Sequence, residues 1–153
     1  MFMARMHTRK RGTSSSTRPL RTQNPEWVPV DAAEIGKLVG KMAKEGLSSA
    51  VIGTRLRDQY GVPSVKLATG KSVLALMKES GIKMEFPEDV RNLMKRAVKL
   101  ALHLSKRPKD LHNLRRLHLL EAKIRRLVKY YHGTGALPKD WYYSLETAKL
   151  LVE

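Results

Sequence analysis

The sequence has 153 residues and a strong excess of positive charge, since 30 Lys and Arg stand against 14 Asp and Glu and leave a net charge of +16. It contains no Cys, which excludes disulfides and thiolate metal sites, and no apolar run long enough for a transmembrane helix or a signal segment. We therefore expect a soluble, cytoplasmic protein with a polyanionic partner, no membrane and no small-molecule substrate.

Residues 1–25 read as a basic arm that contains no acidic residue. Small polar residues and isolated cations cannot form a core, so we expect the arm to be disordered alone and to order on nucleic acid. The cations expected to bind there are Arg5, Arg9, Lys10 and Arg11.

Residues 26–82 read as a small helical unit. Between residues 31 and 60, apolar residues recur at helical spacing in two stripes: Ile35, Leu38, Val39 and Met42, then Val51, Ile52 and Leu56. Asp31 and Ser48 are predicted N-caps, and Gly46 and Gly61 are predicted helix ends. A third short helix is expected after Gly70, with Val73, Leu74 and Met77 facing inward.

Residues 83–153 read as a long antiparallel helical hairpin with a C-terminal extension. Pro87, Glu88 and Asp89 favour a helix start, and an inward stripe follows at Val90, Leu93, Met94, Ala97, Val98 and Ala101. After Pro108, a second helix is expected from Asp110 to about His132, stopped by Gly133 and Gly135, with inward Leu114, Leu117, Ile124, Leu127, Val128 and Tyr131. A last helix is expected over residues 145–152. No stretch alternates as a strand does, so the fold class is all-α.

Motifs for catalysis are incomplete. Thr69-Gly70-Lys71-Ser72 resembles half of a phosphate-binding loop, but Val65 stands where the first Gly of the full motif belongs. The five His form no compact metal pattern, and there is no Gly-x-Ser-x-Gly sequence. We expect no enzyme, no metal and no cofactor.

Positive charge is concentrated on the second helix of the hairpin. Between residues 106 and 129, nine basic residues stand against two acidic ones. At about 100° per residue, one stripe faces away from the apolar one: His112, Arg115, Arg116, Leu119, Lys123, Arg126 and Tyr130. A solvated charged face is one reading, but cations without carboxylate partners repel one another, which favours an anionic partner. Tyr130 would offer a ring for an unstacked base.

The predicted turn of the hairpin carries Lys106, Arg107 and Lys109 beside a second group, His103, Asp110 and Asn113. Asp110 has an ordinary role as the N-cap of the second helix. It could also accept a hydrogen bond from a guanine amino group in the shallow minor groove of RNA, where His103 and Asn113 would contact 2′-hydroxyls or bases. Both readings stay open at this point.

Nearly the whole chain resembles a known family, the universal small-subunit ribosomal protein numbered fifteen in bacteria, in its archaeal and eukaryotic form. The matching segments are Arg5-Met6-His7, Gly46-Leu47, Ile52-Gly53, Leu56-Arg57-Asp58, Gly61-Val62, Thr69-Gly70, Pro87-Glu88-Asp89, His103-Leu104, Lys109-Asp110, residues 124–131, Leu137-Pro138, Trp141 and Thr147-Ala148.

The resemblance implies a helical protein that binds the central domain of small-subunit ribosomal RNA at a three-way junction. It implies minor-groove contacts for His103, Asp110 and the position of Asn113, which is Ser in bacterial members, and a junction contact for Tyr130. The bacterial Thr-Gly loop is not recognisable near Met84. We expect a structural protein of the small subunit that supports assembly and translation beside neighbouring ribosomal proteins, with a contact to the large subunit left open.

The alternative is a DNA-binding regulator, because residues 31–60 read as helix, turn and helix.

Overall fold

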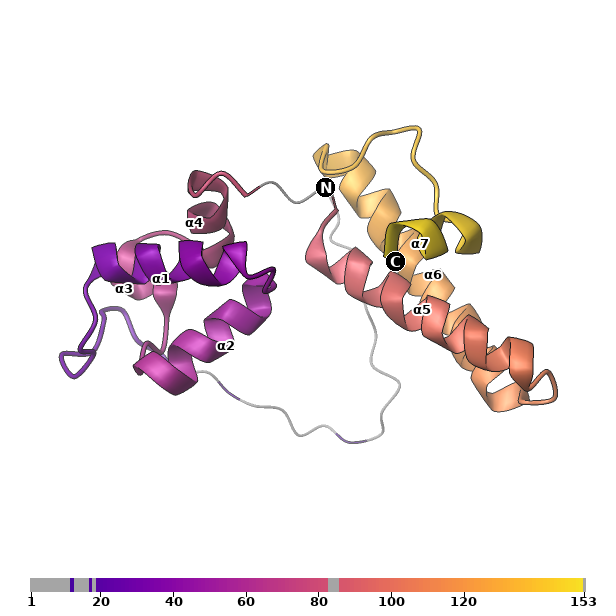
Figure 1. The fold of residues 1–153 in the computed structure, drawn as a ribbon, viewed down its shortest axis with the longest axis horizontal. Helices are drawn as coiled ribbons and strands as arrows, with labels where there is room; N and C mark the ends of the chain where they lie inside the picture. The colour runs from indigo at the N-terminus through magenta and orange to yellow at the C-terminus, as the bar shows by residue number, and fades with distance from the viewer. Residues whose placement is uncertain (1–11, 13–16, 18, 83–85, 153) are drawn as a thin grey trace. The chain divides into compact units, whose positions relative to one another are not determined.

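The computed structural model describes residues 12, 17, 19–82 and 86–152, and these residues form seven helices in two compact units (Figure 1). The first unit holds α1 to α4 and the second holds α5 to α7. The all-α prediction is confirmed, since no strand occurs among the described residues. None of the helices in this part of the chain combines the length and apolar character needed to cross a bilayer.

The first unit consists of α1 (Ala32–Lys44), α2 (Ser49–Tyr60), α3 (Val65–Thr69) and α4 (Val73–Glu79). Helix α1 contacts each of the other three, and α2 also contacts α4. Ile35, Val39, Ile52 and Leu56 are fully buried in its apolar core. Spacing of three or four residues places these side chains on one face of each helix, so their burial drives the packing.

Local signals fix the helix ends of this unit. The backbone N–H of Val51 donates to the Ser48 hydroxyl, which confirms Ser48 as an N-cap. Asp31 holds the N-cap position of α1, but its side chain makes no capping hydrogen bond. Gly61 ends α2 with φ +66°, a left-handed conformation that favours Gly.

The second unit is the expected hairpin. In Figure 1, α5 (Glu88–Lys106) and α6 (Leu111–Thr134) run side by side in opposite directions, and α7 (Leu145–Val152) packs on α5. Their apolar core includes Val90, Met94 and Ile124, all fully buried. Phe86 and Trp141, with ring centroids 5.2 Å apart, join the start of α5 to the segment before α7.

Three residues expected to face inward are exposed instead. The exposed fractions are 43% for Val51, 41% for Leu74 and 37% for Leu114. Val51 and Leu74 lie off the buried stripe of their helices, and in α4 the buried residues are Leu76 and Met77. Leu114 lies in the first turn of α6, where the partner helix has just ended and offers less surface to cover it.

One additional helix and one helix end differ from the sequence prediction. Helix α3 is the additional helix, because five residues are too few to show a period. Gly133 does not stop α6, which continues to Thr134 and ends at Gly135 with φ +72°. Of the two Gly, only Gly135 takes the left-handed conformation that closes a helix.

Candidate nucleic-acid interface

The turn between α5 and α6 brings the three polar residues of the predicted cluster into direct contact. Asp110 is the N-cap of α6, and its Oδ1 accepts from the backbone N–H of Asn113 at 3.0 Å. Its Oδ2 lies 2.7 Å from Asn113 Nδ2 and 3.0 Å from His103 Nε2. The residues therefore form one hydrogen-bonded group, and Asp110 serves as a helix cap within it.

Hydrogen bonds keep this carboxylate ionised. The Asn113 backbone N–H, followed by the side chains of His103 and Asn113, holds the pKa of Asp110 far below its usual range. Because an ionised carboxylate only accepts, we assign the proton at the contact to His103 Nε2. The group thus places an ionised carboxylate in an otherwise cationic region.

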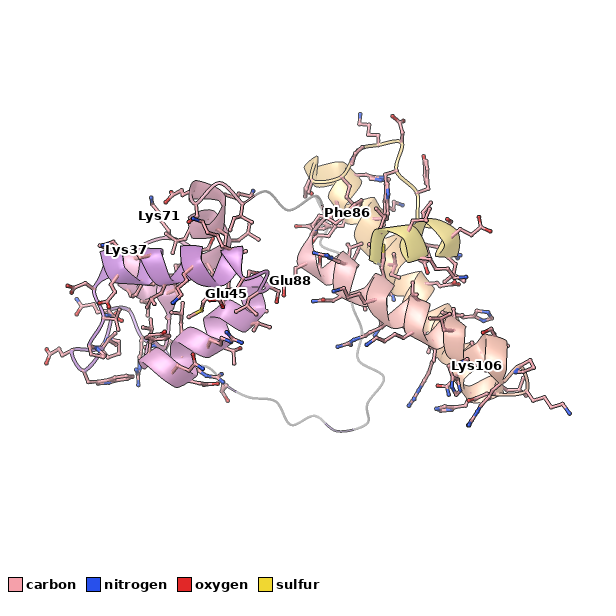
Figure 2. The ribbon with its side chains drawn as sticks, in the orientation of Figure 1. Lys37, Glu45, Lys71, Phe86, Glu88 and Lys106 are labelled. Atoms are coloured by element: carbon pink, nitrogen blue, oxygen red, sulfur yellow. The ribbon has the colours of Figure 1, made fainter. Side chains whose placement is uncertain are left out.

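The polar stripe predicted on α6 does face away from the apolar core. His112, Arg115, Arg116 and Arg126 are exposed, whereas Lys123 and Tyr130 are partly buried. Leu117, Ile124, Leu127 and Val128 are buried on the opposite side. Around the turn, Lys106, Arg107 and Lys109 are exposed, and Figure 2 labels Lys106 at the end of α5.

Few carboxylates neutralise these cations. Arg125 lies 3.9 Å from Glu121, and Arg126 Nε donates to the carbonyl of Ala122 at 3.2 Å. Arg115, Arg116 and Lys123 form no ion pair with any carboxylate that the structure describes. Their charge is left to solvent or to an anionic partner.

A groove between α5 and α6 adds residues that the sequence had not singled out. It has a volume of about 560 Å³, with Asn113, Arg116 and Lys123 from α6 facing Arg96 and Lys99 from α5. Its apolar lining comes from Leu100, Leu119 and Leu120. The sequence carries one signal for this extension to α5, since no acidic residue stands between Asp89 and Asp110.

Two adjacent Tyr have different positions at the far end of α6. The Tyr131 hydroxyl donates to Asp89 Oδ2 at 2.7 Å, which ties α6 to the first turn of α5. Burial, and next the bond to Asp89, raises the pKa of Tyr131. The Tyr130 ring meets the Tyr131 ring edge to face, with centroids 5.2 Å apart. Tyr131 thereby supports the ring of Tyr130.

Some of the predicted site residues cannot be placed in the fold. Arg5, Arg9, Lys10, Arg11 and the Met84 position lie outside the described residues.

The incomplete phosphate-loop sequence is split between two helix ends. Gly70 ends α3, and the Ser72 hydroxyl accepts from Ala75 N–H at the start of α4. Lys71 pairs with Glu79 at 2.7 Å. The part of the chain that the structure describes holds no cluster of metal-ligating side chains.

Two family models match successive parts of the sequence. Residues 3–62 match the Ribosomal S13/S15 N-terminal domain, and residues 74–151 match Ribosomal protein S15.

Curated relatives match along their whole length. The small ribosomal subunit protein uS15 of Methanococcus vannielii is 56% identical over 151 residues, which cover 99% of this chain and 100% of the relative. The proteins of the same name from Methanoregula boonei and Methanoculleus marisnigri are 54% and 52% identical over 150 residues, with 98% of this chain and 99% of each relative covered.

Proposed function

Because this chain belongs to the ribosomal protein S15 family and so has a structural role in the small ribosomal subunit, we propose that its hairpin binds small-subunit ribosomal RNA directly. The target is a helix of the central domain and the three-way junction beside it, and binding supports subunit assembly. The observation that carries the proposal is the group of Asp110, His103 and Asn113 set within a cationic surface on which Arg115, Arg116 and Lys123 have no carboxylate partner among the described residues. This role is structural and requires no catalytic group.

The bonding pattern of Asp110 suggests how the site reads an RNA minor groove. A carboxylate has about four acceptor positions, and three are used here, two on Oδ2 and one on Oδ1. Oδ1 therefore keeps an acceptor position for a guanine amino group, the donor that distinguishes G·C pairs in the minor groove. The His103 ring then contacts a 2′-hydroxyl, a group that DNA lacks.

The cations position the RNA without specifying its sequence. On α6 these are Arg115, Arg116, Lys123 and Arg126 with His112, and near the turn they are Lys106, Arg107 and Lys109. Arg96 and Lys99 extend the same surface to α5. Tyr130 supplies a ring for a base at the junction.

Other parts of the proposal concern the rest of the chain. We propose that the chain has three functional divisions: the basic arm of residues 1–25, the small helical unit of residues 26–82 and the hairpin region of residues 83–153. In the arm, the RNA contacts are made by Arg5, Arg9, Lys10 and Arg11. Neighbouring small-subunit proteins are further partners, and a contact with the large subunit is left to experiment.

The direct test is Asp110→Asn, because Asn also caps helices well but removes the negative charge and replaces Oδ2, the acceptor for His103 and Asn113, with a donor. We expect affinity for the junction RNA to fall about tenfold or more, because the neutral amide oxygen is a weaker acceptor for the guanine amino group and the two neighbouring side chains are no longer held; a specific base contact is worth about 1–3 kcal/mol. Affinity for an unrelated RNA duplex should stay the same or rise, because a negative charge is removed.

The matched control is Asp31→Asn, which removes the same charge at the N-cap position of α1. It should change neither affinity by more than about twofold. If Asp110→Asn weakens junction and unrelated RNA equally, the minor-groove assignment is wrong.

A DNA-binding helix-turn-helix at α1 and α2 is less well supported. The two arginines of α2 already have carboxylate neighbours: Arg55 lies 3.8 Å from Glu45, and Arg57 lies 2.7 Å from Asp58. A helix that reads DNA needs such cations free for phosphates and bases. Competition between duplex DNA and the junction RNA at fixed salt separates the two functions, and preferential DNA binding would favour the alternative.

A further inference from the structure

The first unit has a surface groove that the hairpin proposal does not use. Its volume is about 910 Å³, and apolar and cationic side chains line it together. Trp27, Leu67 and Leu20 supply apolar surface, whereas Arg21, Arg57 and Lys66 supply charge. Leu20 and Trp27 are both exposed, and apolar side chains that are exposed together rather than singly mark interaction sites.

Trp27 is held in place as an exposed platform. The Val28 N–H donates to the carbonyl of Pro25 at 3.2 Å, which closes a turn with Trp27 inside it. Val28 packs against the core of the unit and anchors this turn. A Cβ atom on Gly61 would lie 3.9 Å from the indole, so the ring rests close to the end of α2. Even so, 62% of Trp27 is exposed.

The charges around the indole favour an anionic ligand. The Arg21 guanidinium lies 5.9 Å from the ring centroid, within the range of a cation–π contact. Neither Arg21 nor Lys66 pairs with a carboxylate among the described residues. The third cation of the groove, Arg57, does have a carboxylate partner, because it pairs with Asp58.

We propose that this groove is a second RNA site, separate from the hairpin, in which one unpaired base of a single strand stacks on Trp27. The flanking phosphates meet Lys66, and Arg21 completes the stack from its position beside the indole. A π platform combined with unpaired cations is the arrangement that single-stranded nucleic acids use, because every base has a π face and every linkage a negative charge. An acidic peptide would match the charge but not the flat ring.

The experiment uses the full chain with Trp141→Phe, so that Trp27 is the sole remaining Trp. A six-nucleotide oligoadenylate is titrated at fixed salt while Trp27 fluorescence is followed. Saturable quenching is expected, and an abasic strand of equal length and charge should give little quenching. Circular dichroism checks that each variant keeps its helices.

Matched variants locate the effect. Lys66→Ala should weaken the apparent affinity about threefold to tenfold, whereas Lys78→Ala, an exposed Lys of the same unit outside the groove, should change it less than about twofold. In the chain that keeps Trp141, Trp27→Ala should weaken oligoadenylate binding by at least about fivefold, as loss of one stacked base implies.

Two results would overturn the proposal. Equal quenching by the abasic strand would mean that charge alone, and not base stacking, accounts for binding. Quenching by oligoglutamate but not by oligoadenylate would mean that the groove binds an acidic protein segment instead of RNA. Asp110→Asn should leave the quenching unchanged, so failure here and failure of the hairpin proposal are distinguishable.

Discussion

Asp110 shows how one residue can serve both the fold and a ligand. Its carboxylate caps α6, holds His103 and Asn113, and keeps one acceptor position on Oδ1. A helix cap alone needs one bond from the backbone, which Ser or Thr would also supply. The additional bonds fix the orientation of the three side chains before RNA arrives, which reduces the entropy lost on binding.

The depressed pKa of Asp110 makes stability depend on acid pH. A folded-state pKa below the ordinary 3.8 means that the stabilising effect is complete above about pH 5 and is lost as the pH falls below about 4. The difference in the free energy of unfolding between the wild type and Asp110→Asn should therefore be constant near neutral pH and shrink toward pH 2. Urea unfolding across this range measures it.

Asp31→Asn is the control for that series, because the Asp31 side chain makes no capping hydrogen bond. Its unfolding curves should follow those of the wild type at every pH. A difference for Asp110→Asn that persists unchanged to pH 2 would contradict the role assigned to the carboxylate.

At the scale of the helices, two Gly occupy positions where the fold does not require them. Gly36 lies inside α1 and Gly53 inside α2, and an added Cβ at either would meet no atom within 4 Å. Gly in a helix interior is about 0.5–1 kcal/mol less stable than Ala. Gly36→Ala with Gly53→Ala should therefore stabilise the protein by about 1–2 kcal/mol, measured by thermal unfolding followed by circular dichroism.

Gly61→Ala is the opposite control, because φ +66° is costly for any residue with a Cβ. It should destabilise the protein by about 1 kcal/mol or more. Equal effects of the three substitutions would show that backbone conformation does not decide their sign.

Sequence patterns predicted the long elements better than the short ones. Helices α5 and α6 follow from a Pro-Glu-Asp start, Gly135 and a sustained apolar period. Helix α3 has five residues, so its burial depends on tertiary packing that no local period reveals. Val51 and Leu74 were misplaced because apolar character alone does not say which side of a helix meets a neighbour, and Leu114 because the period does not show where the partner helix ends.

The candidate sites also differ in how well the sequence predicts them. His103, Asp110 and Asn113 could be predicted together because a short turn joins their helices and α6 spaces two of them three residues apart. Arg96 and Lys99 join that surface only through the packing of α5 on α6. The groove at Trp27 combines residues separated by up to 48 positions, so no motif in the sequence indicates it.

For the whole molecule, the net charge of +16 predicts binding that weakens steeply with salt. Arg126→Ala should weaken binding to all RNAs and lower the slope of log K against log salt by about 1, the value for one lost phosphate contact. Filter binding at several salt concentrations provides this slope.

Arg125→Ala is the matched control, since Arg125 is the exposed neighbour of Arg126 on α6 but lies outside the outward stripe. Its slope should change less than that of Arg126→Ala. An equal change for both would mean that the outward stripe of α6 has no special part in binding.

The two separate cores also affect how cooperatively the chain unfolds. One core is built from α1 to α4 and the segments around them, the other from α5 to α7, and no buried residue in the described part of the chain belongs to both clusters. All-or-none unfolding is expected of a single core, so this chain should have two transitions with their own midpoints. The Gly substitutions should then shift only the midpoint of the unit that holds α1 to α4, and Asp110→Asn only the midpoint of the unit that holds α5 to α7. Trp27 and Trp141 lie one in each unit, so the chain carries a natural reporter for each transition.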